Sequence, residues 1–175
     1  MTIVNAVWTA ELPIRCGERL PLAALARRLT NIEYAPQRFN AIVARMRRPR
    51  ATLLLFPTGR MVATGCVRQA DARRAVRRLA RRLRCTARVS RVCIANVVVA
   101  GSVAGPLNLE LLAHFWGGAY TPELFPAAQF RISTFAVTAF ANGKWFATGI
   151  RSTELAENAE QRIRQSLAVF ATVTR

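Results

Sequence analysis

The sequence has few of the residues from which catalytic and metal sites are built. Its 175 residues include one His and nine acidic residues, and none of its four Cys stands in a Cys-x-x-Cys spacing. Because zinc needs grouped Cys and His ligands, we expect no metal. We also expect no cofactor and no enzyme activity, since the carboxylates form no cluster. The cysteines (Cys16, Cys66, Cys85 and Cys93) are expected to be buried free thiols of a reducing compartment.

Long apolar runs are absent as well. No stretch reaches the roughly 18 apolar residues that a membrane-spanning helix requires. The chain starts Met-Thr-Ile-Val-Asn and lacks the basic segment of a secretory signal. We therefore expect no membrane partner. The length suits one domain, or two small fused ones.

Acidic residues are too few to balance the basic ones, and Lys144 is the only lysine. The net charge is +17, and it is unevenly placed. Residues 1–91 hold 20 Arg and four acidic residues, whereas residues 92–175 hold six basic and five acidic residues. A charge of this size predicts an acidic polymer as partner: nucleic acid first, acidic protein or anionic lipid second.

The chain contains a repeated unit. The apolar segment Ala51–Phe56 recurs as Phe135–Phe140, and each copy leads through a Gly-containing turn into a β-rich segment that ends in Ala-Thr-Gly. The corresponding glycines of the two copies are 84 residues apart. Asn142-Gly143 between two such segments is typical of a hairpin with a type I′ turn, which needs positive φ at both central residues. The pattern predicts a duplicated β-hairpin.

Both halves are expected to follow one order: strand, helix, four strands, long helix. One strand of each four is weak and lies near a Pro-bearing loop. The predicted strands are 5–12, 39–47, 51–56, 61–65, 92–101, 130–132, 135–140 and 145–149. The predicted helices are 20–29, 67–83, 107–116 and about 153–170, and the loops are 33–39 and 120–125. We predict an α+β fold with repeats at 1–91 and 92–175 in one continuous structural domain.

The helix predicted at 67–83 is strongly two-sided. Val76, Leu79, Ala80 and Leu83 form an apolar stripe at helical spacing. Its other face holds six arginines (Arg73, Arg74, Arg77, Arg78, Arg81 and Arg82), and little acid is near to neutralise them. Such a face is ordinarily a surface exposed to solvent. Because the arginines repel one another, binding of an acidic partner is an equally favoured interpretation.

The repeated strand has a face with few charges. Thr52, Leu54 and Phe56 alternate onto one side, and Val62 and Thr64 do the same on the return strand. The long helices can cover only one side of such a sheet. The other side is then an exposed apolar surface that needs a partner, unless it too is buried in the protein.

Several motifs, taken in order, resemble the TATA-box-binding protein family over essentially its full conserved core. They are Asn31–Phe39, Arg45–Arg50, Phe56–Gly65, Tyr120–Pro126, Phe140–Lys144 and Ala147–Gly149. The resemblance implies a pseudo-two-fold saddle, with a curved ten-stranded antiparallel sheet and helices on its convex side. It implies a general transcription initiation factor that binds and bends A·T-rich promoter DNA in the minor groove. The alternative is a paralogue that serves as a transcription-factor-binding scaffold with weak or altered DNA preference. An enzyme that uses this sheet as an accessory domain is the third option, which the lack of a second domain opposes.

The resemblance also assigns residues to DNA. Four phenylalanines (Phe39, Phe56, Phe125 and Phe140) match the family's intercalating wedges. Asn5 and Asn96 match amides that donate to the A N3 and T O2 acceptors. The other groove-facing positions are Val7, Thr9, Leu54, Val62, Thr64, Val98, Phe146 and Thr148. The phosphate-facing positions are Arg38, Arg45, Arg50, Arg60, Arg131, Lys144 and Arg151.

Protein partners follow from the same resemblance. The loop with Glu123 and Leu124 is expected to bind a transcription factor IIB-like protein. The helix at 67–83 is expected to bind a transcription factor IIA-like or otherwise acidic protein through Arg73, Arg74, Arg77, Arg78 and Arg81. We expect a monomer on DNA, with a weak homodimer through the concave face as the alternative off DNA. The family occurs in archaea, eukaryotes and large DNA viruses. A nuclear location, in the host for a virus, is expected over the archaeal cytoplasm.

Four positions depart from the family pattern. Ala100 stands in place of Ser, Thr138 in place of Leu, and Phe146 in place of Val; Thr121 replaces an acidic residue of the partner-binding loop. The first three fall in the second half, on the strand face assigned to DNA. The sequence therefore predicts that A·T selectivity is better preserved in the first half than in the second.

Overall fold

A computed structural model describes residues 2–15, 17–84 and 89–171 of the chain. These residues form two compact units, one of residues 5–95 and one of residues 96–171 together with 2–4. Cys16 and Cys85 lie outside the described residues. The placing of the repeat boundary after residue 91 stays a prediction.

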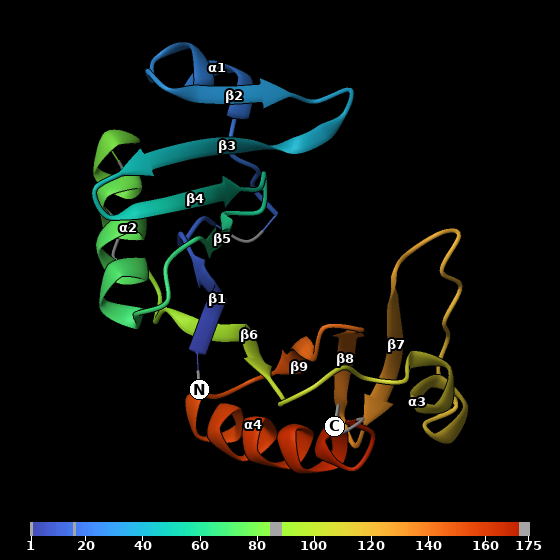
Figure 1. The fold of residues 1–175 in the computed structure, drawn as a ribbon. Helices are drawn as coiled ribbons and strands as arrows, with labels where there is room; N and C mark the ends of the chain where they lie inside the picture. Colours follow the sequence, from blue (N-terminus) through green and yellow to red (C-terminus); the bar gives the residue numbers. More distant parts are fainter. Residues whose placement is uncertain (1, 16, 85–88, 172–175) are drawn as a thin grey trace. The chain divides into compact units, whose positions relative to one another are not determined.

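The first unit is an antiparallel sheet with two helices. Its strands are β1 (Thr2–Glu11), β2 (Ile32–Ala35), β3 (Phe39–Arg47), β4 (Arg50–Leu55) and β5 (Arg60–Thr64). They lie in the order β2-β3-β4-β5-β1. Helix α1 (Leu22–Arg27) contacts β2 and β3, and α2 (Gln69–Arg82) runs along β4 and β5 (Figure 1).

Strict alternation in β4 and β5 separates two faces of this sheet. Leu53, Leu55 and Met61 are fully buried and pack with Val76 and Leu79 of α2 in one core. Leu22 of α1 belongs to the same core, so both helices cover the same face. The side chains between them in sequence, such as Leu54 and Val62, are only half-buried. The face opposite α2 is therefore left uncovered by the helices of this unit.

Two neighbouring leucines test this division of faces. We expect Leu53→Ala to lower the free energy of unfolding by about 2–5 kcal/mol, because it opens a cavity under α2. Leu54→Ala removes the same atoms from the open face and should cost about 1 kcal/mol or less. Urea denaturation of the two variants measures both values. Equal losses would contradict the assignment of Leu54 to an uncovered face.

The second unit repeats the arrangement with one strand fewer. Its strands are β6 (Cys93–Ser102), β7 (Ala127–Ile132), β8 (Phe135–Phe140) and β9 (Lys144–Ile150), in the order β6-β9-β8-β7. Helix α3 (Leu109–Phe115) contacts β7, and α4 (Thr153–Ala168) lies against β9 (Figure 1). Ala156, Ala159, Ile163 and Leu167 form the fully buried stripe of α4.

The expected order of elements is confirmed, but the described residues form nine strands, not ten. The first unit has its weak strand, β2, which occupies part of the segment predicted as the loop 33–39. In the second unit its counterpart is reduced to one bridge between Ala119 and Gln129. Pro122 and Pro126 frame the following loop, and because proline lacks an N–H it cannot extend the ladder.

The type I′ turn predicted at Asn142-Gly143 is wrong, and the first hairpin has the same pattern. Gly59 donates its N–H to the Phe56 carbonyl and Gly143 to that of Phe140, each over 3.0 Å. Only the Gly of each turn has a positive φ, +79° at Gly59 and +81° at Gly143. A three-residue connection, a type I turn followed by a left-handed Gly, accounts for this pattern in the first hairpin, where Phe56 also pairs with the Arg60 carbonyl.

Candidate nucleic-acid interface

The open face of the first unit is crossed by two rows of paired side chains. Residues paired across neighbouring strands share a face, and the register places Leu54 beside Val62 and Thr52 beside Thr64. Val7 and Asn5 lie on the same side of β1, because they alternate with its buried residues. The first row is Thr9, Val62, Leu54 and Val43, and the second is Thr64, Thr52 and Arg45. The groove-facing residues predicted in this half therefore lie together.

The second unit has the same two rows with different contents. Its first row is Ala100, Phe146, Thr138 and Gln129, and its second is Thr148, Ala136 and Arg131. The three groove-side departures from the family pattern thus fall in a single row. Compared with the family pattern, Phe146 is a larger side chain, whereas Ala100 and Thr138 are smaller ones. The three departures are therefore neighbours across adjacent strands, which the sequence alone did not show.

Thr138 is less accessible than its position on this face suggests. It is 8% exposed, whereas Leu54 at the matching position of the first unit is half-buried. Phe146 lies directly beside it, and the Phe146 ring is 6.3 Å from the ring of Phe140. A hollow on this side of the unit is lined by Gln129, Thr138 and Thr148, among others. The open face of the second unit therefore differs from that of the first unit by the aromatic ring of Phe146 and by this hollow.

The four predicted wedges form two aromatic pairs. Phe39 and Phe56 meet edge to face with ring centroids 5.7 Å apart, and Phe125 and Phe140 do the same at 6.1 Å. Phe39 is 45% exposed and Phe125 42%, which is unusual for side chains of this size. Each pair joins a residue at the start of β3 or shortly before β7 to a residue just after β4 or at the end of β8. The structure brings together residues that the sequence separates.

Asn5 and Asn96 have their amides oriented by the backbone. The Asn5 side-chain oxygen Oδ1 accepts from the N–H of Gly65 at 3.2 Å and lies 3.2 Å from the Thr64 hydroxyl. Asn96 Oδ1 accepts from the N–H of Gly149 at 2.9 Å. Because an N–H must meet the oxygen, the NH₂ group of each amide points elsewhere, and no partner for it lies among the described residues. The final Gly of each Ala-Thr-Gly segment thus positions one amide donor.

The predicted phosphate-facing residues are exposed, and two of them have partners within the chain. Arg45 forms a 2.8 Å ion pair with Glu33, and Arg131 donates to the Thr134 carbonyl at 3.0 Å. An ion pair this exposed contributes about 0–1 kcal/mol, so a phosphate can readily displace it. The others, Arg38, Arg50, Arg60, Lys144 and Arg151, are exposed and make no hydrogen bond or ion pair with their side chains inside the described ranges.

The arginines of α2 divide into two groups. Arg74 pairs with Asp71 at 2.8 Å, Arg78 donates to the Arg48 carbonyl at 2.8 Å, and Arg82 donates to the Thr30 carbonyl. Arg73, Arg77 and Arg81 have no such partner within residues 2–15, 17–84 and 89–171. One column of the helix is thus bound to its own unit, whereas the other is free for a partner.

Some exposed residues were missed from the sequence. Leu111 is 50% exposed and Phe115 65% exposed on α3, and neither was singled out. Phe115 packs its ring edge against Trp116 and Phe170. Leu111 and Phe115 lie on the polar side of the predicted helix, and this position could have identified them as exposed from the sequence. In the loop predicted to bind a partner, Glu123 is exposed and Leu124 is 84% exposed.

The cysteines are only partly as expected. Cys66 is a buried free thiol, and burial, with the nearby Asp71 carboxylate second, raises its pKa above the ordinary value. It therefore stays protonated at neutral pH. Cys93 is free but exposed, so the prediction that it is buried is wrong. The described residues hold no group of His, Cys, Asp and Glu that could bind a metal ion.

Fold and site together define a class: a duplicated α+β protein whose open sheet faces carry apolar rows, aromatic pairs and oriented amides, edged by arginines. The model for the family "Transcription factor TFIID (or TATA-binding protein, TBP)" matches residues 1–86 and 91–170. The chain belongs to this family, whose members are DNA-binding transcription factors and not enzymes.

Relatives support the same conclusion. The chain is 35% identical to the TATA-box-binding protein of Saccharomyces cerevisiae, over 97% of this chain and 72% of that protein. It is 34% identical to TATA-box-binding protein 1 of Arabidopsis thaliana, over 97% of this chain and 86% of that protein. It spans a smaller share, 62%, of the Artemia franciscana relative. The solved structure of the Methanococcus jannaschii TBP superposes with a TM-score of 0.78 at 29% identity, covering 95% of this chain and 97% of that one.

Across the described part of the chain, no helix is long and apolar enough to cross a membrane.

Proposed function

We propose that this protein is a general transcription initiation factor that binds A·T-rich promoter DNA in the minor groove and bends it. The observation that carries the proposal is the repetition of one set of groups in both units. Each unit has a pair of edge-to-face phenylalanines and one Asn whose NH₂ group is free to donate. Duplex DNA is itself nearly two-fold symmetric, so two like sets of groups suit it.

The amides supply the base preference in this proposal. The minor groove of an A·T pair presents only the acceptors A N3 and T O2, whereas a G·C pair adds the guanine amino donor. Asn5 and Asn96 offer donors there, because their oxygens are already engaged by Gly65 and Gly149. A donor facing the guanine amino group would be unpaired and repelled. The arrangement therefore favours A·T pairs.

The phenylalanines supply the bend. An apolar side chain inserted between base pairs unstacks them at a cost of about a few kcal/mol, which the apolar contact of the bent duplex offsets. The exposed Phe39 and Phe125 are available for insertion, and each is supported by its half-buried partner. The exposed arginines around the faces bind phosphates and set affinity and register.

The protein acts on DNA as a monomer, in the nucleus, and recruits initiation factors. The loop with Glu123 and Leu124 serves a transcription factor IIB-like protein, supported by the exposure of both side chains. The basic helix α2 serves a transcription factor IIA-like or other acidic protein, supported by its three arginines that the described residues leave without a partner.

A gel-shift comparison tests the DNA preference. We expect tighter binding to an A·T-rich box than to a G·C duplex of equal length at physiological salt. Each mismatched base pair should cost about 1–3 kcal/mol. Equal affinity for both duplexes would instead support the alternative function, a transcription-factor-binding scaffold that has lost sequence preference.

The second unit carries Phe146 and Thr138 where the first unit has Val62 and Leu54, and this difference favours an altered base preference in the second half. We expect the paired substitution Thr138→Leu/Phe146→Val, which restores the first unit's residues, to sharpen discrimination at the base pairs under the second unit. The reciprocal Leu54→Thr/Val62→Phe is the matched control and should relax discrimination under the first unit. Binding to duplexes with one G·C pair moved stepwise along the box measures both, with expected changes of about 1–3 kcal/mol at one position. Identical base profiles for all three proteins would contradict a role of this row in specificity.

A further inference from the structure

The open face of the second unit has a hollow over its outer strands, β7 and β8. Its volume is about 720 Å³, and residues 116–119 form its wall beside the edge of β7. Two small side chains account for the space. The strand registers match Ala136 with Thr52 of the first unit, and Thr138 with Leu54. The second unit therefore has less side-chain volume at this place than the first unit has.

The hollow is lined by polar groups that lack partners. Gln129 is exposed, and its amide makes no hydrogen bond with the other described residues. Thr138 is 8% exposed, and its hydroxyl is also without a partner in the described ranges, which is unusual for so buried a group. The Thr148 hydroxyl is likewise unpaired there, whereas the matching Thr64 hydroxyl lies 3.2 Å from Asn5 Oδ1. One amide and two hydroxyls are thus available to a ligand.

The amide of Gln129 differs from those of Asn5 and Asn96 in what it can offer. Both Asn side-chain oxygens accept from a backbone N–H, so these two amides present their donors. The Gln129 oxygen meets no N–H among the described residues, and so it can accept. The residue matched to Gln129 in the first unit is Val43, which has no polar side-chain atom. At this matched position only the second unit has an acceptor.

The hollow borders the aromatic pair of the second unit. Thr138 and Phe140 are alternate residues of β8, so their side chains point to the same side of the sheet. Gln129 lies beside Thr138 on β7. In the proposed complex the pair of Phe125 and Phe140 enters a base step, and the hollow faces the base pair next to that step. Its polar groups are thus placed to contact the minor-groove edge of one base pair.

We propose that the hollow binds the amino group of a guanine, so that the second unit prefers a G·C pair at this one position. In the minor groove a G·C pair differs from an A·T pair by this amino group, which is both a protrusion and a donor. The hollow gives the group room, and Gln129 Oε1 and the Thr138 hydroxyl accept from it. The inference rests on the proposed binding to the minor groove and names the group that sets specificity under the second unit.

The matching place in the first unit would exclude the same base pair. Val43 and Leu54 are paired there, and both are aliphatic. A guanine amino group against them would lose its hydrogen bond to water and gain none in return, which is the costly case for a buried polar group. The two halves of the protein are therefore expected to prefer different base pairs.

Replacing guanine by inosine tests the proposal, because inosine lacks only the amino group. One G·C or inosine·C pair is moved stepwise along an A·T-rich box, and fluorescence anisotropy measures the affinity of the full-length protein for each duplex. At one position we expect guanine to bind about threefold to tenfold more tightly than inosine, the worth of one net hydrogen bond. At the base pairs facing Asn5 and Asn96, guanine should bind about fivefold or more weakly. The absence of any position that favours guanine would overturn the proposal.

Three variants locate the acceptor. Gln129→Val introduces the residue of the first unit and should remove the preference for guanine over inosine. Gln129→Glu keeps an acceptor oxygen, so the preference should be retained although the added charge weakens binding to every duplex. Gln165→Val removes an exposed amide from α4 and is the matched control, which should leave the base profile unchanged. A guanine preference that survives Gln129→Val would contradict the role of Gln129.

The same titrations separate this inference from the proposed function. If guanine binds more weakly than inosine at every position, the protein reads the minor groove and only the inference about the hollow fails. If guanine and inosine bind equally at every position, the amino group is not sensed at all, and the proposed minor-groove preference fails together with the inference.

Discussion

Replacing both hairpin phenylalanines, Phe56→Ala with Phe140→Ala, is expected to remove most of the bend in a bound A·T-rich duplex. Each ring supports an exposed partner, Phe39 or Phe125, at 5.7 and 6.1 Å. Without the support, neither partner is held in place to enter a base step. Loss of apolar contact of about 1.5–3 kcal/mol per ring corresponds to a tenfold to hundredfold loss of affinity for each.

Energy transfer between dyes at the two ends of the duplex measures the bend, and titration gives the affinity. Phe115→Ala is the matched control, because Phe115 is the 65% exposed phenylalanine of α3. It should leave both quantities unchanged. Thermal unfolding should show intact units, since Phe56 and Phe140 are only half-buried and lie outside the core under the helices. Wild-type bending by the single Phe140 variant would show that the second unit does not insert a wedge.

The two faces of the sheets could be predicted because the relevant signal is local. Side chains alternate along a strand, so Leu53 and Leu54 must point to opposite sides whatever surrounds them. The apolar stripe of α2 is likewise set by helical spacing. The sequence thus sufficed to place most of the expected groove-facing residues on one side. Their partners across the sheet required the register, which depends on contacts between distant segments.

Predictions failed where a second segment decides the outcome. Thr138 was placed on the face assigned to DNA, but it is only 8% exposed and is paired with Phe146 of the neighbouring strand. The pair Asn142-Gly143 predicted a type I′ turn, but only Gly143 of the two residues has a positive φ. The resemblance implied ten strands, but the second unit has only the bridge between Ala119 and Gln129 at the place of the tenth, in a segment that Pro122 and Pro126 interrupt. Neither the turn or strand propensity of a residue nor the sequence repeat shows what a distant segment of the chain contributes.

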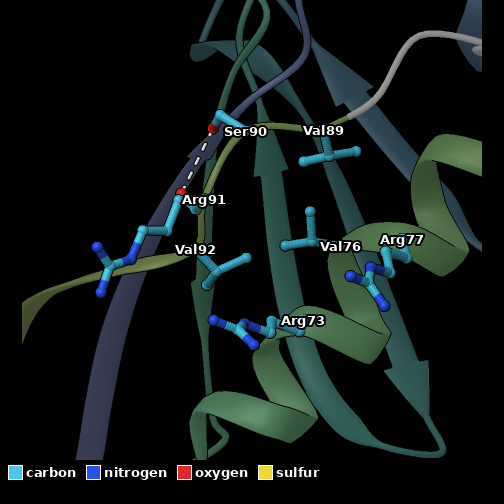
Figure 2. Close-up of a pocket in the computed structure, with 7 residues that line it drawn as sticks. All are labelled: Arg73, Val76, Arg77, Val89, Ser90, Arg91 and Val92. Carbon is cyan, nitrogen blue, oxygen red and sulfur yellow. Dashed lines mark hydrogen bonds between the residues drawn. The ribbon is translucent and has the colours of Figure 1, made fainter.

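The basic helix shows the same limit in its electrostatics. The sequence gives six arginines on one face, with nothing to distinguish them. The structure separates them, because the carbonyls that bind Arg78 and Arg82 come from residues 30 and 52 positions away. Of the six arginines, Arg73 and Arg77 line a pocket between α2 and residues 89–92 (Figure 2). Charge composition therefore predicts that a partner exists, and folding decides which arginines can reach it.

Replacing both amides, Asn5→Asp with Asn96→Asp, is expected to abolish selective binding to A·T-rich DNA. A carboxylate has the same shape and still accepts from the N–H groups of Gly65 and Gly149, so the strand ends stay in place. It cannot donate, however, and it brings a negative charge toward the A N3 and T O2 acceptors. Each unpaired contact costs about 1–3 kcal/mol, so we expect the double variant to lose about a hundredfold or more in affinity.

Asn108→Asp is the matched control for this change. The Asn108 side chain caps α3 by accepting from the Leu111 N–H at 3.0 Å, and Asp fills a cap position equally well. It adds one negative charge to the second unit without touching the open face, so it separates a general charge effect from a local one. Asn5→Leu with Asn96→Leu removes the donor without adding charge. We expect it to erase the preference for A·T over G·C while retaining the salt-dependent part of binding, which comes from phosphates. Tight, A·T-selective binding by the Asp variant would show that the bases are read by other groups, and the row of Leu54 and Val62 would then be the next residues to test.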